Sequence, residues 1–533
     1  MKLPGHGIRW LLLAVLTSGV LLVPLGAQQA AAATVRRVPQ DYPTIQAAID
    51  AAVAGDTVLV SPGTYVERID FQEKEITVES TDGPASTIID GNQAGVVVRI
   101  VASAGQTPVL RGFTIRNGNN DGFFGGGVYA YGGPALIEGN WVTGNVGCNG
   151  GGIEADASSA TIRDNIVSDN RPGCSGGPGG GGILLLGAGT ANVLHNTITG
   201  NVTAADGGGI ALFAAGSPTI SGNVISNNAT EPGRSGGGIS LGNATDALIT
   251  NNIIFGNSAS RGGGIYWLGP NGQPVVNNTI ADNTAASGSA VFADGFDEAN
   301  RLTNNILVGS GSQAVLECGD FNDLNPPLII YNDVFNAGSG PRYGGICTDQ
   351  TGQNGNISAD PQFVDPAAGN YHVQVGSPAV DAGLNEGAPA TDIDGNPRPL
   401  DGNGDGVAVV DIGADEVRTG DTTPPTITCA ATPGTLRPPN HKLRPVSVAV
   451  SASDDSGSVT VTLVSVTSSQ PDSGLGREDV PNDIQGWTTG TDDRSGLLRA
   501  ERFKTARVYT LTYRADDPAA NTASCQTTVT VPK

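Results

Sequence analysis

Short apolar runs and asparagines alternate in one repeated pattern along the middle of the chain. Each copy has an apolar run, an asparagine, four further residues and a second asparagine, and a glycine-rich link leads into the next apolar run. The seven copies are IEGNWVTGN (137–145), IRDNIVSDN (162–170), VLHNTITGN (193–201), ISGNVISNN (220–228), ITNNIIFGN (249–257), VVNNTIADN (275–283) and LTNNILVGS (302–310). Their first asparagines lie 25 to 31 residues apart. A period of this length is typical of a stacked solenoid.

Glycine clusters form the second part of each repeat. GGGV (125–128) begins the series, GGGI follows at 150, 180, 207, 236 and 262, and GSAV (288–291) is a weaker copy. Glycine clusters favour sharp turns, and the runs between them are short and rich in Val, Ile and Thr, as strands are. A coil of about 25–30 residues with short strands and no helical apolar stripe predicts a parallel β-helix.

Stacked coils place like residues beside one another, because neighbouring strands lie roughly 4.8 Å apart. One internal aliphatic ladder is therefore predicted from Val128, Ile153, Ile183, Ile210, Ile239, Ile265 and Val291. The asparagines are predicted to form ladders as well, with each amide bonding the next. We interpret these asparagines as structural.

Three segments outside the repeats carry a family resemblance. DYPTIQAAIDAAVAGDTVLVSPGTYVE (41–67), ADPQFVDPAAGNYHVQVGSPAVDAG (359–383) and DIGADE (411–416) are similar to the entry and closing segments of the right-handed parallel β-helix superfamily that includes pectate lyases. The resemblance covers residues 42–417. It implies the fold, but the superfamily contains lyases, hydrolases, esterases and non-catalytic surface proteins, so it does not assign a function.

The order of segments predicts an exported, all-β chain of two domains. Residues 1–33 resemble a secretory signal, with Lys2 and Arg9 before an apolar run and three alanines at a cleavage site, so no membrane span is expected after cleavage. Residues 34–417 are predicted to form the β-helix. A helix over 44–54 is expected to cap it, regular coils to run from about 110 to 310, and residues 311–417 to close its other end.

A linker at 418–425 precedes a region of different composition. Alternating strands such as RPVSVAVSAS (444–453) and VYTLTYRAD (508–516) predict a small immunoglobulin-like β-sandwich over 426–533. The region resembles Ig-like modules at the C-termini of bacterial exported proteins. Such modules usually have a D-x-x-G-N turn, and DDPAAN (516–521) lacks its glycine.

Six cysteines fit an exported chain. Cys148 and Cys174 lie just past the second asparagine of consecutive repeats, so stacking brings them within reach of a disulfide. Cys318 with Cys347, and Cys429 with Cys525, are the other natural pairs. No CxxC or Cys/His cluster indicates a cysteine metal site.

The acidity of the chain belongs to its first part. Residues 1–420 have 17 basic and 39 acidic side chains, whereas residues 421–533 have 11 and 12. This charge disfavours nucleic acid and anionic lipid as partners. It also disfavours a polyuronate ligand unless cations bridge it.

Side chains beside the aliphatic ladder are predicted to point outward, because they alternate along a strand. The first outward row is Tyr129, Glu154, Leu184, Ala211, Ser240, Tyr266 and Phe292, and the second is Tyr131, Asp156, Leu186, Phe213, Gly242, Leu268 and Asp294. Tyr129, Tyr131, Tyr266 and Phe292 are candidates for stacking on sugar rings. Glu154 and Asp156 are candidate catalytic carboxylates, since glycoside hydrolysis needs such a pair. The alternative is a solvated strand face with scattered aromatics.

DGNGDGVAVVD (401–411) resembles a calcium loop. Asp401, Asn403, Asp405 and Asp411 are its candidate ligands, because oxygen donors at this spacing suit Ca²⁺. The match is imperfect, since Asp411 comes one position early. An acidic surface turn is the alternative, and we interpret His195 and His372 as structural or solvent-facing.

These observations favour a secreted or cell-surface protein that engages an extracellular polysaccharide without cleaving it. A polysaccharide lyase or glycoside hydrolase is the alternative, so the sequence leaves enzymatic activity open. The only lysine within 34–417 is Lys74, and no lyase or polygalacturonase motif is recognisable. An exported scaffold without a glycan ligand is a further possibility.

Overall fold

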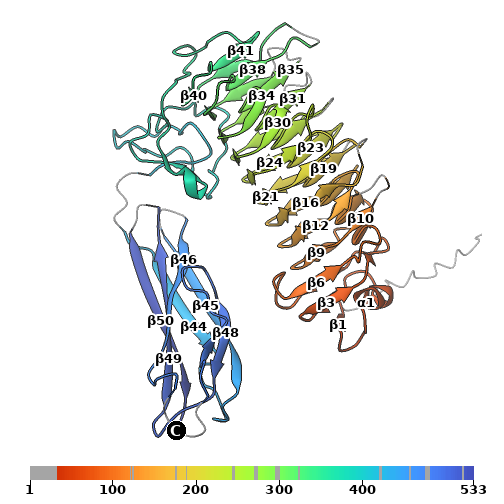
Figure 1. The fold of residues 1–533 in the computed structure, drawn as a ribbon, viewed down its shortest axis with the longest axis vertical. Helices are drawn as coiled ribbons and strands as arrows, with labels where there is room; N and C mark the ends of the chain where they lie inside the picture. The colour runs from red at the N-terminus through yellow and green to blue at the C-terminus, as the bar shows by residue number, and fades with distance from the viewer. Residues whose placement is uncertain are drawn as a thin grey trace, which may run out of the picture.

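The chain folds into a stack of parallel β-coils followed by an antiparallel sandwich (Figure 1). The structure is a computed structural model that describes residues 33–120, 122, 125–174, 177–187, 189–242, 246–268, 274–294, 300–321, 324–418, 423–454, 458–473, 480–518 and 521–533. The predicted signal segment lies outside these residues except for Ala33, as do residues 419–422 of the predicted linker.

Three long parallel sheets form the walls of the β-helix. The first sheet contains β1 (Val35–Val38), β2 (Thr57–Val60), β5 (Thr77–Ser80), β8 (Val109–Arg111), β12 (Leu136–Glu138), β16 (Thr161–Arg163), β20 (Asn192–Leu194), β24 (Thr219–Ser221), β28 (Leu248–Thr250), β32 (Pro274–Val276), β36 (Arg301–Thr303) and β39 (Leu328–Ile330). The second sheet contains β3 (Gly63–Val66), β6 (Thr87–Asp90), β9 (Thr114–Arg116), β13 (Trp141–Thr143), β17 (Ile166–Ser168), β21 (Thr197–Thr199), β25 (Val224–Ser226), β29 (Ile253–Phe255), β33 (Thr279–Ala281), β37 (Ile306–Gly309) and β40 (Asp333–Asn336).

The third sheet carries the aliphatic ladder. It contains β4 (Ile69–Asp70), β7 (Val98–Ala102), β11 (Val128–Gly132), β15 (Ile153–Asp156), β19 (Ile183–Leu186), β23 (Ile210–Phe213), β27 (Ile239–Leu241), β31 (Ile265–Leu268), β35 (Val291–Asp294), β38 (Leu316–Cys318) and β41 (Tyr343–Gly345). Two short sheets precede it in the coils, one of β10 (Asn119–Asn120), β14 (Val146–Gly147) and β18 (Arg171–Pro172), the other of β22 (Val202–Thr203), β26 (Ala229–Thr230), β30 (Ser258–Arg261) and β34 (Thr284–Ser287).

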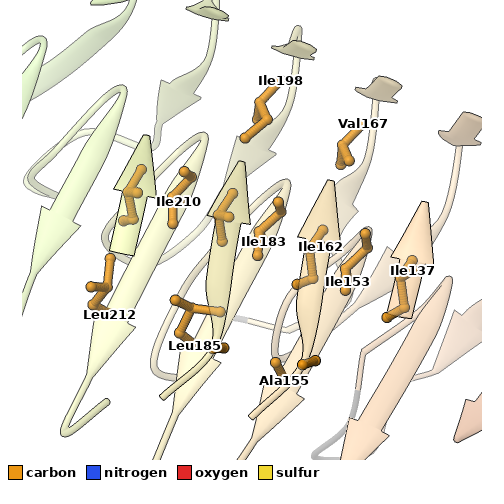
Figure 2. Close-up of a cluster of buried hydrophobic side chains, with 14 of the residues drawn as sticks. Ile137, Ile153, Ala155, Ile162, Val167, Ile183, Leu185, Ile198, Ile210 and Leu212 are labelled. Carbon is orange, nitrogen blue, oxygen red and sulfur yellow. The ribbon is translucent and has the colours of Figure 1, made fainter. Parts of the chain in front are cut away.

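The aliphatic ladder has the register expected from the sequence. Ile153 pairs with Ile183, and Ile183 pairs with Ile210. Figure 2 shows these side chains following one another between the sheets, and all three are fully buried. The parallel β-helix predicted from the sequence is therefore confirmed.

Two asparagine ladders run beside the aliphatic core. In the first, Asn196 donates its backbone N–H to Asn223 Oδ1 at 2.9 Å, and Asn223 donates to Asn252 Oδ1 at 3.0 Å. The second ladder runs from Asn145 to Asn283 with the same geometry. The structural interpretation of the asparagines is confirmed, and the first ladder continues beyond the last repeat copy to Asn332 and Asn356.

The N-terminal helix is shorter than expected. Helix α1 spans Ile45–Ala51, and the Thr44 side chain caps it by accepting from the Ala47 N–H. Ile45, Ala48 and Ile49 are buried, as the predicted apolar face requires. The helix ends before the predicted limit because Ala52 is extended, with ψ of 150°.

Residues 311–417, predicted to close the other end of the β-helix, continue its coils and then pass along its side. Strands β38 to β41 continue the coils. Residues 359–417, the strap, then lie over the outer side of the second sheet, where the ring of Tyr371 packs 4.7 Å from Phe255. Asn277 Nδ2 donates to the Asp411 carbonyl at 3.0 Å, 134 residues away in the sequence. The strap contains β42 (Phe363–Asp365), η1 (Pro366–Ala368) and β43 (Asn370–Val373).

The C-terminal region has two antiparallel sheets around its own apolar core. One sheet has the order β44 (Thr426–Thr432), β45 (Leu443–Ser453), β48 (Ser495–Arg499) and β47 (Ile484–Gln485); the other has β46 (Thr460–Ser468), β49 (Arg507–Asp516) and β50 (Thr522–Val531). This is a small β-sandwich. Its strand order is the one that constant-type immunoglobulin sandwiches have.

The cysteines pair as expected from the sequence. Disulfides join Cys148 to Cys174, Cys318 to Cys347 and Cys429 to Cys525, with Cα separations of 5.0, 5.2 and 6.0 Å. The first two link neighbouring coils and the third links the two sheets of the sandwich. In the described part of the chain, no helix has the length and apolar character needed to span a membrane.

Candidate functional site

The third sheet brings the candidate carboxylates and aromatics together as the sequence predicted. Tyr129 pairs with Glu154, and Tyr131 pairs with Asp156, on the neighbouring strands β11 and β15. Tyr266 pairs with Phe292 on β31 and β35. The two groups are separate, because β19, β23 and β27 lie between them.

The first outward row is closed to solvent, which corrects the expectation of an open face. Tyr129 is 7 % exposed, Tyr266 8 % and Phe292 6 %. The glycine turn before each strand covers this row. An added Cβ on Gly125 would lie 3.0 Å from the Glu154 Cβ, and one on Gly207 would lie 2.7 Å from the Ala211 Cβ.

The second outward row contains the open aromatic positions of this face. Tyr131 is 45 % exposed and Phe213 46 % exposed, while Asp156 between them along the stack is half-buried. The Tyr131 ring lies nearly parallel to the Tyr129 ring, with centroids 6.3 Å apart and 17° between the planes. Phe213 belongs to the row identified in the sequence, but it was not selected there as a binding residue.

Glu154 is a buried carboxyl group beneath the glycine turn. It is 1 % exposed, and its Oε2 accepts from the Gly125 N–H at 2.5 Å. Burial raises the pKa of Glu154 to about 8 and the Asp156 carboxylate adds to this, although the Gly125 N–H and the Asn149 side chain oppose it. At neutral pH the protonated form of Glu154 therefore predominates.

Asp156 has a different environment from Glu154. Burial raises its pKa, whereas the Tyr129 hydroxyl, which donates to Asp156 Oδ2 at 3.4 Å, lowers it. Tyr129 itself has a raised pKa, first because it is buried and then because of Asp156 and Glu154. One of the two candidate carboxylates is thus sealed beneath a turn, and the other lies at the surface.

The titration of Glu154 predicts a pH-dependent stability. Its pKa is about 8 when folded and near 4.5 when unfolded, so the native state binds more protons between these values. Stability contributed by this group is full below pH 4.5 and falls as pH rises. Glu154→Gln removes the titration, so the variant should gain stability over wild type as pH rises from 5 to 8, on the order of 3–5 kcal/mol by pH 8.

Chemical denaturation of both proteins between pH 5 and 8 measures this difference. Glu386→Gln, at an exposed position, controls for the loss of one negative charge. A difference between Glu154→Gln and wild type that stays constant with pH contradicts the prediction.

Tyr266 and Phe292 form a closed aromatic cluster. Their ring centroids are 5.9 Å apart, and the Arg261 guanidinium lies 5.4 Å from the Phe292 centroid. Asp294, 5 % exposed, accepts from the Phe321 N–H at 3.0 Å. Neither ring has the open face that sugar stacking needs, because both are more than nine-tenths buried.

The proposed calcium ligands do not gather around one point. Asp401 accepts from the N–H groups of Gly404 and Gly406 within its own loop, and Asp405 accepts from Val407. Asn403 Oδ1 accepts from the Asp405 N–H at 2.9 Å. The Asp411 carboxylate is buried and accepts from the N–H groups of Asp381 and Val417 at 2.7 and 2.6 Å. The assignment of Asp401, Asn403, Asp405 and Asp411 to one calcium site therefore stays a prediction.

A histidine and two carboxylates meet in the strap instead. In the described chain, His372, Asp394 and Asp415 are the one group of at least three His, Cys, Asp or Glu side chains whose ligand atoms all lie within 4.8 Å of one another. The sequence interpretation of His372 as structural or solvent-facing missed this group. Asp392 and Asp394, at alternate positions of DIDGN (392–396), could have indicated a metal-binding turn. Nothing in the sequence predicted that this turn lies beside His372.

A family match agrees with the observed coils. The sequence pattern of the family described as periplasmic copper-binding protein (NosD) matches residues 49–260 and 179–338, which together span more than half of the chain. The chain belongs to the NosD family. The match includes Glu154, Asp156 and both aromatic groups, and it ends before the strap and the sandwich.

Other comparisons add little to the NosD assignment. No curated protein matches the chain. A solved structure, titled as a mannuronic acid specific polysaccharide family 6 lyase enzyme from human gut microbiota, is similar at 12 % sequence identity with a TM-score of 0.25, covering 62 % of this chain and 92 % of that one. A similarity this low assigns no activity to the NosD-family chain.

Proposed function

We propose that this NosD-family protein is exported and engages an extracellular polysaccharide along the second outward row of the third sheet, as a non-catalytic binding protein. The observation that carries the proposal is the open row itself. Tyr131 and Phe213 each expose nearly half of their surface, 45 % and 46 %, with Asp156 and Leu186 between them along the stack. Aromatic faces with neighbouring polar groups suit sugar rings.

The row is also rigid, which favours binding. Its residues belong to hydrogen-bonded strands in continuous register, and Tyr131 lies against Tyr129. Side chains already held in place lose little freedom when a ligand binds. The stacked coils extend the row along the helix axis, as an extended chain ligand needs.

An enzymatic role is the weaker candidate. Glycoside hydrolysis needs two carboxyl groups that flank one bond, and Glu154 is 1 % exposed and hydrogen-bonded to the Gly125 backbone. This points to a structural role for Glu154 as the anchor of the turn above it. Asp156 then remains as a single surface carboxylate suited to accept hydrogen bonds from sugar hydroxyls.

The family description names copper, but binding of Cu(I) by sulfur ligands has little support in the donor set. Soft thiolate and thioether ligands select Cu(I), but the six cysteines form three disulfides and Met1 is the only methionine. We therefore assign no copper-dependent function to the β-helix.

The charge of the chain narrows the ligand class. The net charge is −23, so we propose a neutral polysaccharide in preference to a polyuronate. Three disulfides fit an oxidising compartment outside the cytoplasm. We propose that the Ig-like sandwich is a spacer or attachment domain at the cell surface.

A glycan-binding experiment tests this proposal. The chain from Thr34 onward is screened against neutral and uronate polysaccharides, with and without calcium, recording retention and any release of reducing or unsaturated ends. We expect retention by a neutral polysaccharide without product. The double variant Tyr131→Ala, Phe213→Ala should weaken binding about tenfold or more, because each lost aromatic contact is worth on the order of 1 kcal/mol.

Phe503→Ala is the matched control, since Phe503 is 40 % exposed in the sandwich. Equal weakening by this variant, or no retention of any polysaccharide, contradicts the proposal. Product release that is lost in Asp156→Asn would establish the enzymatic alternative.

A further inference from the structure

The strap brings three potential metal ligands from separate segments to one place. His372 comes from β43, Asp394 from the turn at 392–396 and Asp415 from the segment that ends the strap. His372 Nε2 lies 2.8 Å from Asp394 Oδ2. The Asn370 side-chain oxygen lies 2.6 Å from His372 Nδ1, an arrangement that fixes the ring and leaves Nε2 directed at the carboxylates.

The turn that carries Asp394 holds an unused oxygen donor. Asn396 is 5 % exposed, and its Oδ1 has no hydrogen-bond partner in the described part of the chain. Its Nδ2 donates to Asp392 Oδ2 at 2.9 Å, and the same Asp392 oxygen accepts from the Glu416 N–H at 3.1 Å. Asn396 therefore lies in the same turn as Asp394, and Asp392 of this turn is hydrogen-bonded to Glu416, the neighbour of Asp415.

The surroundings also have more carboxyl groups than basic groups. Asp392, Asp411, Asp415 and Glu416 are each less than 10 % exposed, and Asp394 lies beside them. The basic groups among them are His372 and Arg398, whose guanidinium lies 3.4 Å from Glu416. Buried carboxylates without compensating charge are costly, and a bound cation would offset that cost.

We propose that His372 Nε2 and the carboxylates of Asp394 and Asp415 bind one divalent transition-metal ion, with Zn²⁺ as the best fit. Imidazole nitrogen and carboxylate oxygen are both ligand types that Zn²⁺ takes, whereas Ca²⁺ and Mg²⁺ prefer oxygen alone. Water completes the coordination. Metal binding replaces the hydrogen bond between His372 and Asp394 and releases its proton.

The role of the ion follows from where its ligands lie. Two of the three segments it joins also contact the β-helix: Tyr371, next to His372, donates to Asp282 at 2.9 Å, and the Ala414 N–H, next to Asp415, donates to Thr279 Oγ1 at 3.0 Å. A metal bridge therefore joins the strap segments to one another and so stabilises the contacts that hold the strap against the flank of the solenoid. The site is independent of the polysaccharide-binding row, since it lies on a different sheet.

Metal binding to the full mature chain tests the proposal. After EDTA treatment and desalting, Zn²⁺, Cu²⁺ and Ca²⁺ are titrated separately by calorimetry, and hydrogen exchange of residues 359–417 is followed with and without Zn²⁺. We expect one Zn²⁺ per chain, slower exchange in the strap when it binds, and at least a tenfold weaker affinity in His372→Gln and in Asp394→Asn. Asp394 is exposed, so Asp394→Asn should fold normally.

His195→Gln and Asp401→Asn are the matched controls and should bind Zn²⁺ as wild type does. No Zn²⁺ binding, or Zn²⁺ binding unchanged in both His372→Gln and Asp394→Asn, overturns the proposal. Loss of binding only in Asp401→Asn overturns it too, because it places the ion in the 401–411 loop. Binding of Cu²⁺ at the same residues supports the site and changes the assigned ion.

Discussion

Replacing Asn223 by alanine is expected to destabilise the β-helix by about 4 kcal/mol. Asn223 Oδ1 accepts from the Asn196 N–H at 2.9 Å, and its Nδ2 donates to the Val193 carbonyl at 2.8 Å and to Asn252 Oδ1 at 2.9 Å. The side chain is fully buried. Alanine leaves the buried Asn196 N–H without its acceptor, at about 1–3 kcal/mol, and removes the hydrogen bonds that the Asn223 amide donates, at about 1 kcal/mol each. The midpoint of the solenoid's thermal transition measures the loss.

The control for Asn223→Ala is Asn192→Ala in the preceding coil. Asn192 is a half-buried asparagine at the start of β20, and its truncation should change stability by less than about 0.5 kcal/mol. Equal effects of the two substitutions would contradict the role given to the ladder. The comparison separates the buried hydrogen bonds of the ladder from a general effect of losing an asparagine.

Replacing Gly208 by alanine is expected to cost about 3 kcal/mol or more. An added Cβ would lie 2.5 Å from the Gly237 carbonyl oxygen and 2.8 Å from both the N and the O of Ala229. These are backbone atoms of the next coil, so they cannot move aside without breaking the ladder of hydrogen bonds, and overpacking of this kind destabilises. We expect the melting temperature to fall by about 5 °C or more.

Gly233→Ala is the matched test for Gly208→Ala. Gly233 has φ of +86°, yet an added Cβ there meets no atom within 4 Å. Its substitution carries only the backbone strain of the left-handed region, about 1 kcal/mol. If Gly233→Ala were as destabilising as Gly208→Ala, the close stacking of neighbouring coils would not be the reason for the glycine cluster.

Both variants concern the repeat, which is the part of the fold that could be predicted well. The interval between GGGI copies predicted that Tyr129 lies beside Glu154 and Tyr131 beside Asp156, and the register confirms both pairs. Parallel stacking has one register that keeps the isoleucines inside. The spacing of the repeats in the sequence therefore predicts which residues pair on neighbouring strands. The same logic predicted the disulfide between Cys148 and Cys174.

The exposure of the candidate site could not be predicted in the same way. Alternation along a strand gives the direction of a side chain but not what lies above it. Glu154 points away from the core and is nevertheless 1 % exposed, because the turn at Gly125 passes over it. The open aromatics were therefore found in the second row, where Phe213 had not been selected.

The sequence by itself determined the period, the inward and outward rows, the asparagine ladders and the change from coils to sandwich. These features depend on contacts between residues at equivalent positions of successive repeats. The repeat length in the sequence is therefore enough to identify which residues are in contact. Only the tertiary structure decided the burial of Glu154, the path of the strap across the second sheet and the meeting of His372 with Asp415. These depend on contacts without a period, such as Asn277 with Asp411 across 134 residues, and no regular spacing in the sequence records them.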